Sequence, residues 1–155
     1  MYVLLIVLAS IVSIESYVYD DPPIVNVQLS MNPINDLKYF EFCCEYTGIS
    51  LDKDPASVPW IPTVAFVLNE FELGSFRYNS IDDVSAVYWH TSATIPNLNL
   101  YPRTPKTVRF LHINTIVVQN LSDHSAEGRW YCTVHLTERF GFGLARYVSN
   151  FVYLN

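Results

Sequence analysis

Cysteines and histidines are the residues of this sequence whose side chains could do redox or metal chemistry. The cysteines form an adjacent pair, Cys43 and Cys44, with a distant third, Cys132. This is not the separated ligand pairing of a zinc site, and the histidines do not fall at metal-ligand spacings. We expect them to be surface strand or loop residues: His90, His112, His124 and His135. An odd number of cysteines allows one disulfide and leaves one thiol over.

Motifs for catalysis are not evident. Asp123, His124 and Ser125 are the residue types of a catalytic triad, but sequence neighbours cannot adopt triad geometry, and the stretch is typical of a turn. The sequence has no glycine-rich phosphate-binding loop and no Gly-x-Ser-x-Gly elbow. We therefore expect no enzyme, no metal and no cofactor. A secreted enzyme with a site assembled from distant residues is the lesser alternative.

An apolar segment at the start of the chain predicts secretion. Val3 to Ile14 is hydrophobic apart from two serines, and it is too short to cross a bilayer comfortably, which takes about 20 residues. It is typical of a signal peptide with Ser16 before the cleavage point, although no Lys or Arg precedes it. A hydrophobic first strand is the alternative. We predict a signal peptide over 1–16 and a single secreted, extracellular domain over 17–155.

Charge and composition narrow the class of partner and fold. The formal net charge is −6 and no Lys- or Arg-rich run occurs, so nucleic acid is not an expected partner. No second long apolar segment follows the first, so we expect no membrane anchor. Tyr, Phe, Val and Ile are abundant, and no window repeats at helical spacing, which favours β-structure.

The most informative expected strand is Leu37 to Tyr46. Its two alternating sets are Phe40, Phe42, Cys44 and Tyr46 on one parity, and Glu41, Cys43 and Glu45 on the other. Side chains of a strand alternate between its faces, and an unpaired buried carboxylate is costly, so the glutamates must face water. We therefore expect Cys44 to point into the core and Cys43 to point outward.

Alternation and turn residues place the other strands. We expect strands at 24–31, 63–68, 71–78, 84–91, 107–112, 116–119, 128–134 and 144–154. Asn32 to Asp36 is expected to be a turn, and prolines predict loops from Gly48 to Pro62 and around Pro96 to Pro105.

The segment Ala126-Glu127-Gly128-Arg129-Trp130-Tyr131-Cys132 resembles strand F of an immunoglobulin-like domain. In that family a tyrosine two residues before the cysteine closes the corner between strands E and F, and here Trp130 takes its place. The resemblance implies an all-β, immunoglobulin-like antiparallel β-sandwich with a Cys44–Cys132 disulfide across the sheets. The long spacing between these cysteines then requires long loops or insertions between strands B and E.

The resemblance also implies two aromatic features. The core aromatic of strand C has three candidates, Trp60, Phe66 and Trp89, of which Phe66 needs neither a strand through prolines nor an inserted hairpin. Phe140-Gly141-Phe142-Gly143 is similar to the bulge that opens strand G in variable-type domains. A plain glycine hairpin turn is the alternative.

The expected function is a secreted recognition module that binds an extracellular or cell-surface protein. If the last strand places Val148, Val152 and Leu154 in the core, aromatic side chains gather outside. The predicted binding residues are Tyr131, His135, Tyr147, Phe151 and Tyr153. Two alternatives remain open: the middle of the chain covers this face, or a bulge at Gly143 exchanges the two parities.

Two single residues carry further predictions. Cys43 is expected to be a free or intermolecular thiol, so a disulfide-linked structural or assembly subunit, including a homodimer through Cys43, is the alternative function. Asn120 begins the sequon Asn120-Leu121-Ser122 and is a predicted glycosylation site, with an unmodified turn asparagine as the alternative.

Overall fold

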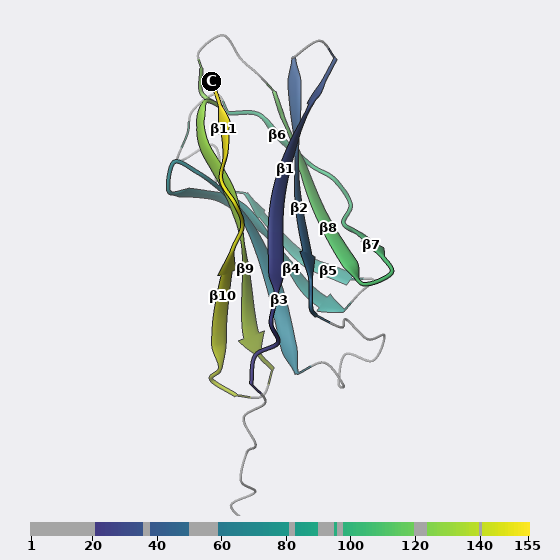
Figure 1. The fold of residues 1–155 in the computed structure, drawn as a ribbon. Helices are drawn as coiled ribbons and strands as arrows, with labels where there is room; N and C mark the ends of the chain where they lie inside the picture. Colours follow the sequence, from purple (N-terminus) through teal and green to yellow (C-terminus); the bar gives the residue numbers. More distant parts are fainter. Residues whose placement is uncertain are drawn as a thin grey trace, which may run out of the picture.

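The protein folds into two antiparallel β-sheets packed face to face (Figure 1). The computed structural model describes residues 21–35, 38–49, 59–80, 83–89, 95, 98–119, 124–139 and 141–155. The regular elements of this part of the chain are all strands. The expected all-β sandwich is therefore confirmed, and it is compatible with an immunoglobulin-like fold.

The first sheet has the strand order β1–β2–β8–β6, with β7 also paired to β8. Its strands are β1 (Asn26–Ile34), β2 (Tyr39–Thr47), β6 (Leu100–Pro102), β7 (Lys106–Val108) and β8 (Leu111–Gln119). The second sheet has the order β10–β9–β3–β4–β5, with β11 also paired to β9. Its strands are β3 (Trp60–Leu68), β4 (Phe71–Ser80), β5 (Asp83–Trp89), β9 (Gly128–Glu138), β10 (Leu144–Val148) and β11 (Val152–Leu154).

The core lies between the sheets and follows the two-residue period of the strands. In β2, Phe42, Cys44 and Tyr46 are completely buried, whereas Glu41 and Glu45 on the other parity are only partly buried. In β9 the core set is Trp130, Cys132, Val134 and Leu136, all completely buried. Phe66 of β3 is also completely buried and pairs with Cys132, so it is a core aromatic of this strand as expected. The Trp89 side chain lies outside the described part.

Two strands run through prolines that were expected to end them. β1 continues through Pro33 to Ile34, and β3 begins at Trp60 and includes Pro62. Among the described strands, β1 pairs with β2 alone, and Pro62 pairs with β9 before the register with β4 begins at Thr63. A proline lacks the N–H of a ladder, and it is tolerated where one side of the strand has no neighbour.

A hairpin replaces the single strand that was expected over 107–112. β7 and β8 pair antiparallel, with Val108 opposite Leu111, and the turn between them consists of Arg109 and Phe110. Arg109 adopts a φ of 58°, which a two-residue hairpin turn requires and which arginine rarely takes. The sequence carries no Asn-Gly or Asp-Gly at this point, which is why the turn was missed.

Several predicted features fall outside the described residues, namely the signal peptide over 1–16, the sequon residue Asn120, His90, and Phe140 of the glycine-containing turn. These predictions stay as they were made. The described ranges contain no helix that is long and apolar enough to cross a membrane.

Candidate functional site: an aromatic platform on β9

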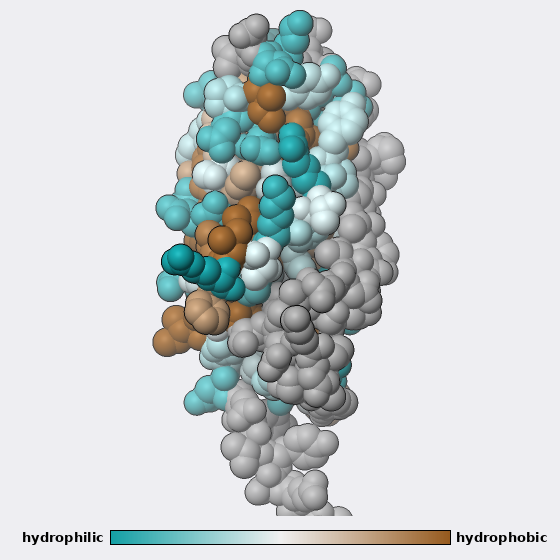
Figure 2. Space-filling view, turned by 90° about the vertical axis from the view of Figure 1, so that its right-hand side faces the viewer, coloured by the Kyte–Doolittle hydropathy of each residue, from teal (hydrophilic) through white to brown (hydrophobic). Residues whose placement is uncertain are grey.

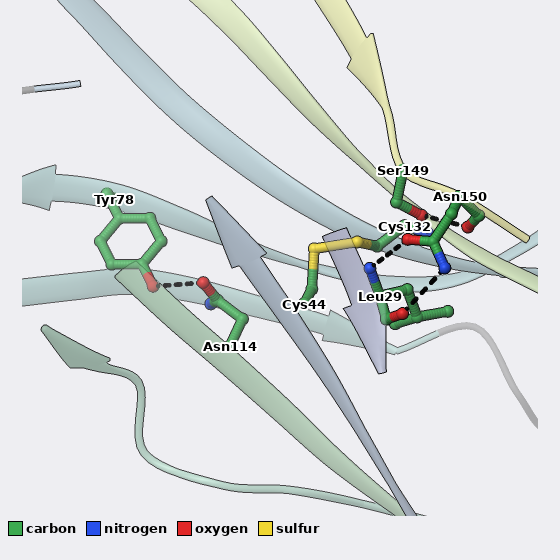
Figure 3. Close-up of a disulfide and its surroundings, with 7 residues drawn as sticks. All are labelled: Leu29, Cys44, Tyr78, Asn114, Cys132, Ser149 and Asn150. Carbon is green, nitrogen blue, oxygen red and sulfur yellow. Dashed lines mark hydrogen bonds between the residues drawn. A yellow bond between two sulfur atoms is a disulfide. The ribbon is translucent and has the colours of Figure 1, made fainter. Parts of the chain in front are cut away.

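A disulfide joins the two sheets at the centre of the core (Figure 3). Cys44 of β2 and Cys132 of β9 are 88 residues apart in sequence, their Cα atoms lie 6.1 Å apart, and both are completely buried. The predicted pairing is confirmed. The bond fixes the position of β9, which carries two of the five predicted binding residues, Tyr131 and His135.

Trp130 closes the corner before the disulfide in a way that the sequence left open. Its ring stacks on Phe42 of β2, with the ring centroids 4.1 Å apart. Its indole Nε1 donates a 2.9 Å hydrogen bond to the carbonyl oxygen of Ala126, four residues upstream. An indole N–H can only donate, and a backbone carbonyl can accept, so a tryptophan suffices where a tyrosine hydroxyl would otherwise make this bond.

The last part of the chain changes parity between β10 and β11. The Cys132 amide donates to Ser149 Oγ at 2.9 Å, and the Asn150 side chain bonds both the N–H and the C=O of Leu29 in β1, at 2.8 and 3.0 Å (Figure 3). The Ser149 N–H still donates a 2.9 Å backbone hydrogen bond to the Cys132 carbonyl oxygen, but β10 ends at Val148 and β11 begins only at Val152. The alternation that runs through β10 is therefore interrupted before β11.

This interruption contradicts the expected outward orientation of one predicted binding residue, Tyr147. Tyr147 is half-buried, packs against the core, and donates a 2.6 Å hydrogen bond from its hydroxyl to the carbonyl oxygen of Pro23. Val148, which was expected in the core, is instead 47% exposed. The parity exchange that was considered at Gly143 occurs at Ser149 and Asn150, after which Val152 and Leu154 face inward as expected.

Three of the predicted residues come together as an aromatic platform, which we define as Arg129, Tyr131, Phe151 and Tyr153. The Tyr131 and Phe151 rings meet edge to face, with centroids 5.5 Å apart, and the Arg129 guanidinium lies 4.8 Å from the Phe151 centroid. Tyr153 of β11 is the register partner of Arg129. Phe151 is 50% exposed and Tyr153 60%, whereas Tyr131 is only 6% exposed because its neighbours cover it.

The β3–β4 turn supports the platform from the side. Glu70 forms an ion pair with Arg129 and accepts a 3.1 Å hydrogen bond from the Tyr131 hydroxyl. Asn69 exchanges hydrogen bonds with the Arg129 backbone through its own N–H and its side-chain oxygen, each at 2.9 Å. Both turn residues have positive φ, 48° and 70°. Figure 1 shows this turn on the upper left, close to β11 and the start of β9.

Arg129 and Glu70 were missed by the sequence analysis, although signals for both were present. Arg129 shares the parity of Tyr131, so it had to lie on the same face of β9. Glu70 lies in the Asn69-Glu70 turn between two expected strands, but nothing in the sequence says that this turn reaches β9. Only the register of β3 with β9, which places Leu68 opposite Trp130, brings the two together.

His135 lies on the same face but apart from the platform, four residues further along β9. It is half-buried and pairs with Arg146 of β10. Burial lowers the pKa of His135 and the Arg146 guanidinium lowers it further, while Glu72 acts in the opposite direction. The imidazole is thus held neutral at neutral pH, and it contributes a hydrogen-bonding surface rather than a charge.

Cys43 is the free thiol that was expected, and it is partly buried on the outer face of the first sheet. The Thr115 hydroxyl donates to its sulfur at 3.6 Å. Burial raises the pKa of Cys43, and the neighbouring carboxylates of Glu41 and Glu45 add to this effect. The fraction of Cys43 present as the reactive thiolate at neutral pH is therefore smaller than for a solvent-exposed cysteine.

A cluster of hydrogen-bonded polar side chains lies in the core, on the side of the disulfide opposite Trp130. The Tyr78 hydroxyl donates to Asn114 Oδ1 at 2.9 Å, and His112 bonds Thr107 and the carbonyl oxygen of Ile49. His112 is 3% exposed, so the expectation that every histidine is a surface residue is wrong. Burial lowers the pKa of His112 and raises that of Tyr78 to about 12. Tyr46 stacks on His112, and burial raises its pKa well above the usual range.

Among the described residues, no group of three or more His, Cys, Asp or Glu side chains is arranged to hold a metal ion. The aromatic platform is the candidate site because of its own geometry: two half-exposed aromatic rings, the Arg129 guanidinium next to them, and the Glu70 carboxylate that pairs with Arg129. In comparisons with known proteins, no family model and no curated protein matches the chain.

Proposed function

We propose that this chain is a secreted, immunoglobulin-like recognition module that binds an extracellular protein through the aromatic platform. The assignment to the variable type rests on strand order. The sheets β1–β2–β8–β6 and β10–β9–β3–β4–β5 correspond to strands A, B, E, D and G, F, C, C′, C″ of that type. The disulfide then joins strands B and F, and it is compatible with an oxidising, extracellular environment.

The observation that carries the binding proposal is that two aromatic rings remain half exposed on a surface that is already ordered. Phe151 and Tyr153 are exposed. Next to them, Glu70 pairs with Arg129 and accepts a hydrogen bond from the Tyr131 hydroxyl, and the Arg129 guanidinium lies over the Phe151 ring. Ordering side chains at an interface costs free energy, and a network formed before binding avoids that cost. Aromatic and arginine side chains are also the residues that dominate binding energy at protein interfaces.

The experiment is a capture screen of the secreted chain against a panel of extracellular domains, followed by variants of the platform. Phe151→Ser with Tyr153→Ser should weaken capture by about tenfold or more, the loss typical of central aromatic residues. Secretion should be unchanged, because both side chains are exposed. Tyr131 is left alone because its burial would turn a binding test into a folding test.

Phe142→Ser is the matched control, since Phe142 is 95% exposed on the turn between β9 and β10, away from the platform. Glu70→Gln should give an intermediate loss by removing the ion pair that holds Arg129. If the platform double variant captures the partner as tightly as the unchanged chain, the platform is not the binding surface.

A disulfide-linked assembly is the second candidate, and the observation in its favour is the free, partly exposed Cys43. Its raised pKa disfavours rapid pairing, so the proposal ranks below recognition. Non-reducing electrophoresis of the secreted chain separates the two. A band at twice the mass that disappears in Cys43→Ser would establish the assembly.

A further inference from the structure

The β7–β8 hairpin presents apolar side chains at an exposed tip. Phe110 is 80% exposed and Val108 is 56% exposed, and both flank Arg109 in or beside the two-residue turn. The residues from Tyr101 to Phe110 are exposed with the exception of Pro105, which is half-buried. The tip therefore protrudes from the sheet instead of packing on it.

Basic side chains surround these apolar residues. Arg103, Lys106 and Arg109 are the charged residues of the stretch 84–122, which contains no acidic residue. The whole chain carries a formal net charge of −6, so this segment is opposite in sign to the rest. Arg103 lies 3.4 Å from a Glu41 oxygen, whereas Lys106 and Arg109 form no ion pair with any described residue. Because the bases are spaced three apart, the sequence shows no compact run of them.

Figure 2 looks onto the side of the molecule on which β7 lies in Figure 1. Hydrophobic surface and strongly hydrophilic side chains protrude next to each other there, towards the lower left of the view. The hairpin segment itself combines apolar and cationic side chains and has no carboxylate of its own, and the nearest acid that pairs with it is Glu41 of β2, beside Arg103. Such a composition suits an interfacial membrane-binding segment, since the apolar groups enter the acyl boundary while the cations meet anionic headgroups.

We propose that the β7–β8 hairpin docks the protein on an anionic lipid surface, with Phe110 and Val108 entering the interface and Lys106 and Arg109 binding lipid headgroups. Shape favours a membrane over a protein partner. A stable protein interface buries about 800 Å² on each side, which a convex two-residue turn cannot provide. A membrane can take up a protruding tip without a complementary pocket. The charge distribution also orients the protein, because an anionic surface attracts the basic hairpin and repels the acidic remainder of the chain.

The position of the tip fits such an orientation. The turn follows the end of β7 and precedes Leu111 at the start of β8, next to Thr47 at the end of β2. The aromatic platform lies where β9 begins and β3 ends, at the opposite end of the sandwich. In Figure 1 the β7–β8 turn is at the lower right and the β3–β4 turn at the upper left. Docking through the hairpin therefore leaves the platform free to face away from the lipid.

The test is sedimentation of the secreted chain with vesicles of phosphatidylcholine alone and of phosphatidylcholine containing phosphatidylserine. We expect binding to the anionic vesicles only, weakening as salt is added. Arg109→Asn removes the charge and keeps a residue that accepts positive φ, so the turn is retained. It should weaken binding about fivefold, the effect of one basic residue near an anionic surface. Phe110→Ser should weaken it about tenfold or more by removing an apolar ring.

Two control variants are available on the other sheet. Phe142→Ser removes an equally exposed ring, and Arg146→Asn removes an exposed cation from β10. Neither should change vesicle binding. Phe110→Trp should show a blue shift of its added fluorescence on anionic vesicles, because the indole enters the interface.

Three outcomes would overturn the proposal. The first is no sedimentation with anionic vesicles. The second is binding that Phe110→Ser and Arg109→Asn leave unchanged. The third is retention by an acidic protein domain of the panel, lost in both variants, with no vesicle binding, which would assign the hairpin to a protein partner instead. Vesicle binding is measured without the platform's partner, so its failure leaves the platform proposal untouched.

Discussion

Two buried regions flank the Cys44–Cys132 disulfide, and they satisfy their polar groups to different degrees. On one side, Trp130 stacks on Phe42 and its indole N–H is bonded to Ala126, four residues away. On the other side, Tyr78 bonds Asn114, but the Tyr46 hydroxyl and Asn114 Nδ2 have no hydrogen-bond partner within the described residues. The hydrogen bond of the first region joins two residues of one short stretch of chain. The polar groups of the second region come from three strands, β2, β4 and β8.

The comparison shows that a polar group is easier to satisfy when its partner is close in sequence. A partner four residues upstream is fixed once β9 forms. Partners on three strands must be aligned by every register between them, and a buried polar group without a partner carries its full desolvation cost. We therefore expect the polar contact of Trp130 to stabilise the fold and the buried hydroxyl of Tyr46 to contribute almost nothing. The disulfide lies between the two regions and links their strands.

The largest expected effect is the loss of the disulfide that both regions share. Cys44→Ala with Cys132→Ala should lower the free energy of unfolding by about 2–5 kcal/mol, because the crosslink closes a long loop in the unfolded chain. Urea unfolding of the secreted chain measures this loss. Cys43→Ser is the matched control and should change little. An unchanged midpoint in the double variant would mean that packing alone aligns the two sheets.

Trp130→Phe should cause the second-largest loss in the free energy of unfolding. It removes the bond to the Ala126 carbonyl and leaves part of the indole volume empty, which should cost about 2–3 kcal/mol. Urea unfolding is again the measurement, with Trp60→Phe as the comparison, since Trp60 Nε1 is buried without a hydrogen-bond partner in the described structure. If Trp60→Phe is as costly as Trp130→Phe, the hydrogen bond to Ala126 contributes nothing measurable.

The two buried tyrosines should respond differently to loss of the hydroxyl. Tyr78→Phe leaves the Asn114 side chain wholly unpaired and should cost about 1–3 kcal/mol. Tyr46→Phe removes an unpaired hydroxyl and should stay within about 0.5 kcal/mol of the unchanged chain. Thermal and urea unfolding of the two variants side by side give the answer. Equal losses would show that Tyr46 has a partner in solution.

The last expected effect is absent at neutral pH and appears only as a loss of stability in alkaline solution. Tyr78 has a pKa of about 12 in the folded chain, above the value of about 10 for an unfolded tyrosine. Because the folded state keeps its proton longer, stability is fully present below pH 10 and is lost as pH rises towards 12. Tyr78→Phe should flatten this decline in urea midpoints measured across that range. Tyr147→Phe is the control, since Tyr147 lies at the edge of the core, and a flattening there of the same size would contradict the assignment.

The sequence predicted the features that depend on period and on residue type. Glu41 and Glu45 fixed the face of β2, and the segment before Cys132 identified its partner, so the disulfide followed. Phe151 and Tyr153 were placed outside correctly. These predictions held because alternation along a single strand requires no knowledge of its neighbours.

The features that failed depend on contacts between distant residues. The pairing is interrupted between β10 and β11, where the Ser149 and Asn150 side chains bond Cys132 and Leu29, and no local pattern in the sequence indicates this. The Arg109-Phe110 turn lacks the residues that turns of this kind favour, and Arg129 meets Glu70 only through the pairing of β3 with β9. Each of these contacts joins elements whose relative position is decided by the packed sandwich.

Asn150 has a consequence for how this protein behaves at high concentration. Its side-chain amide uses the Leu29 N–H and C=O, two groups on the open edge of β1 that a new strand would need. Open strand edges are templates for aggregation and fibril growth, because each added chain continues the same ladder. A side chain from the opposite sheet thus occupies one hydrogen-bonding position within that edge, and a second molecule that pairs along the whole of β1 has to displace it.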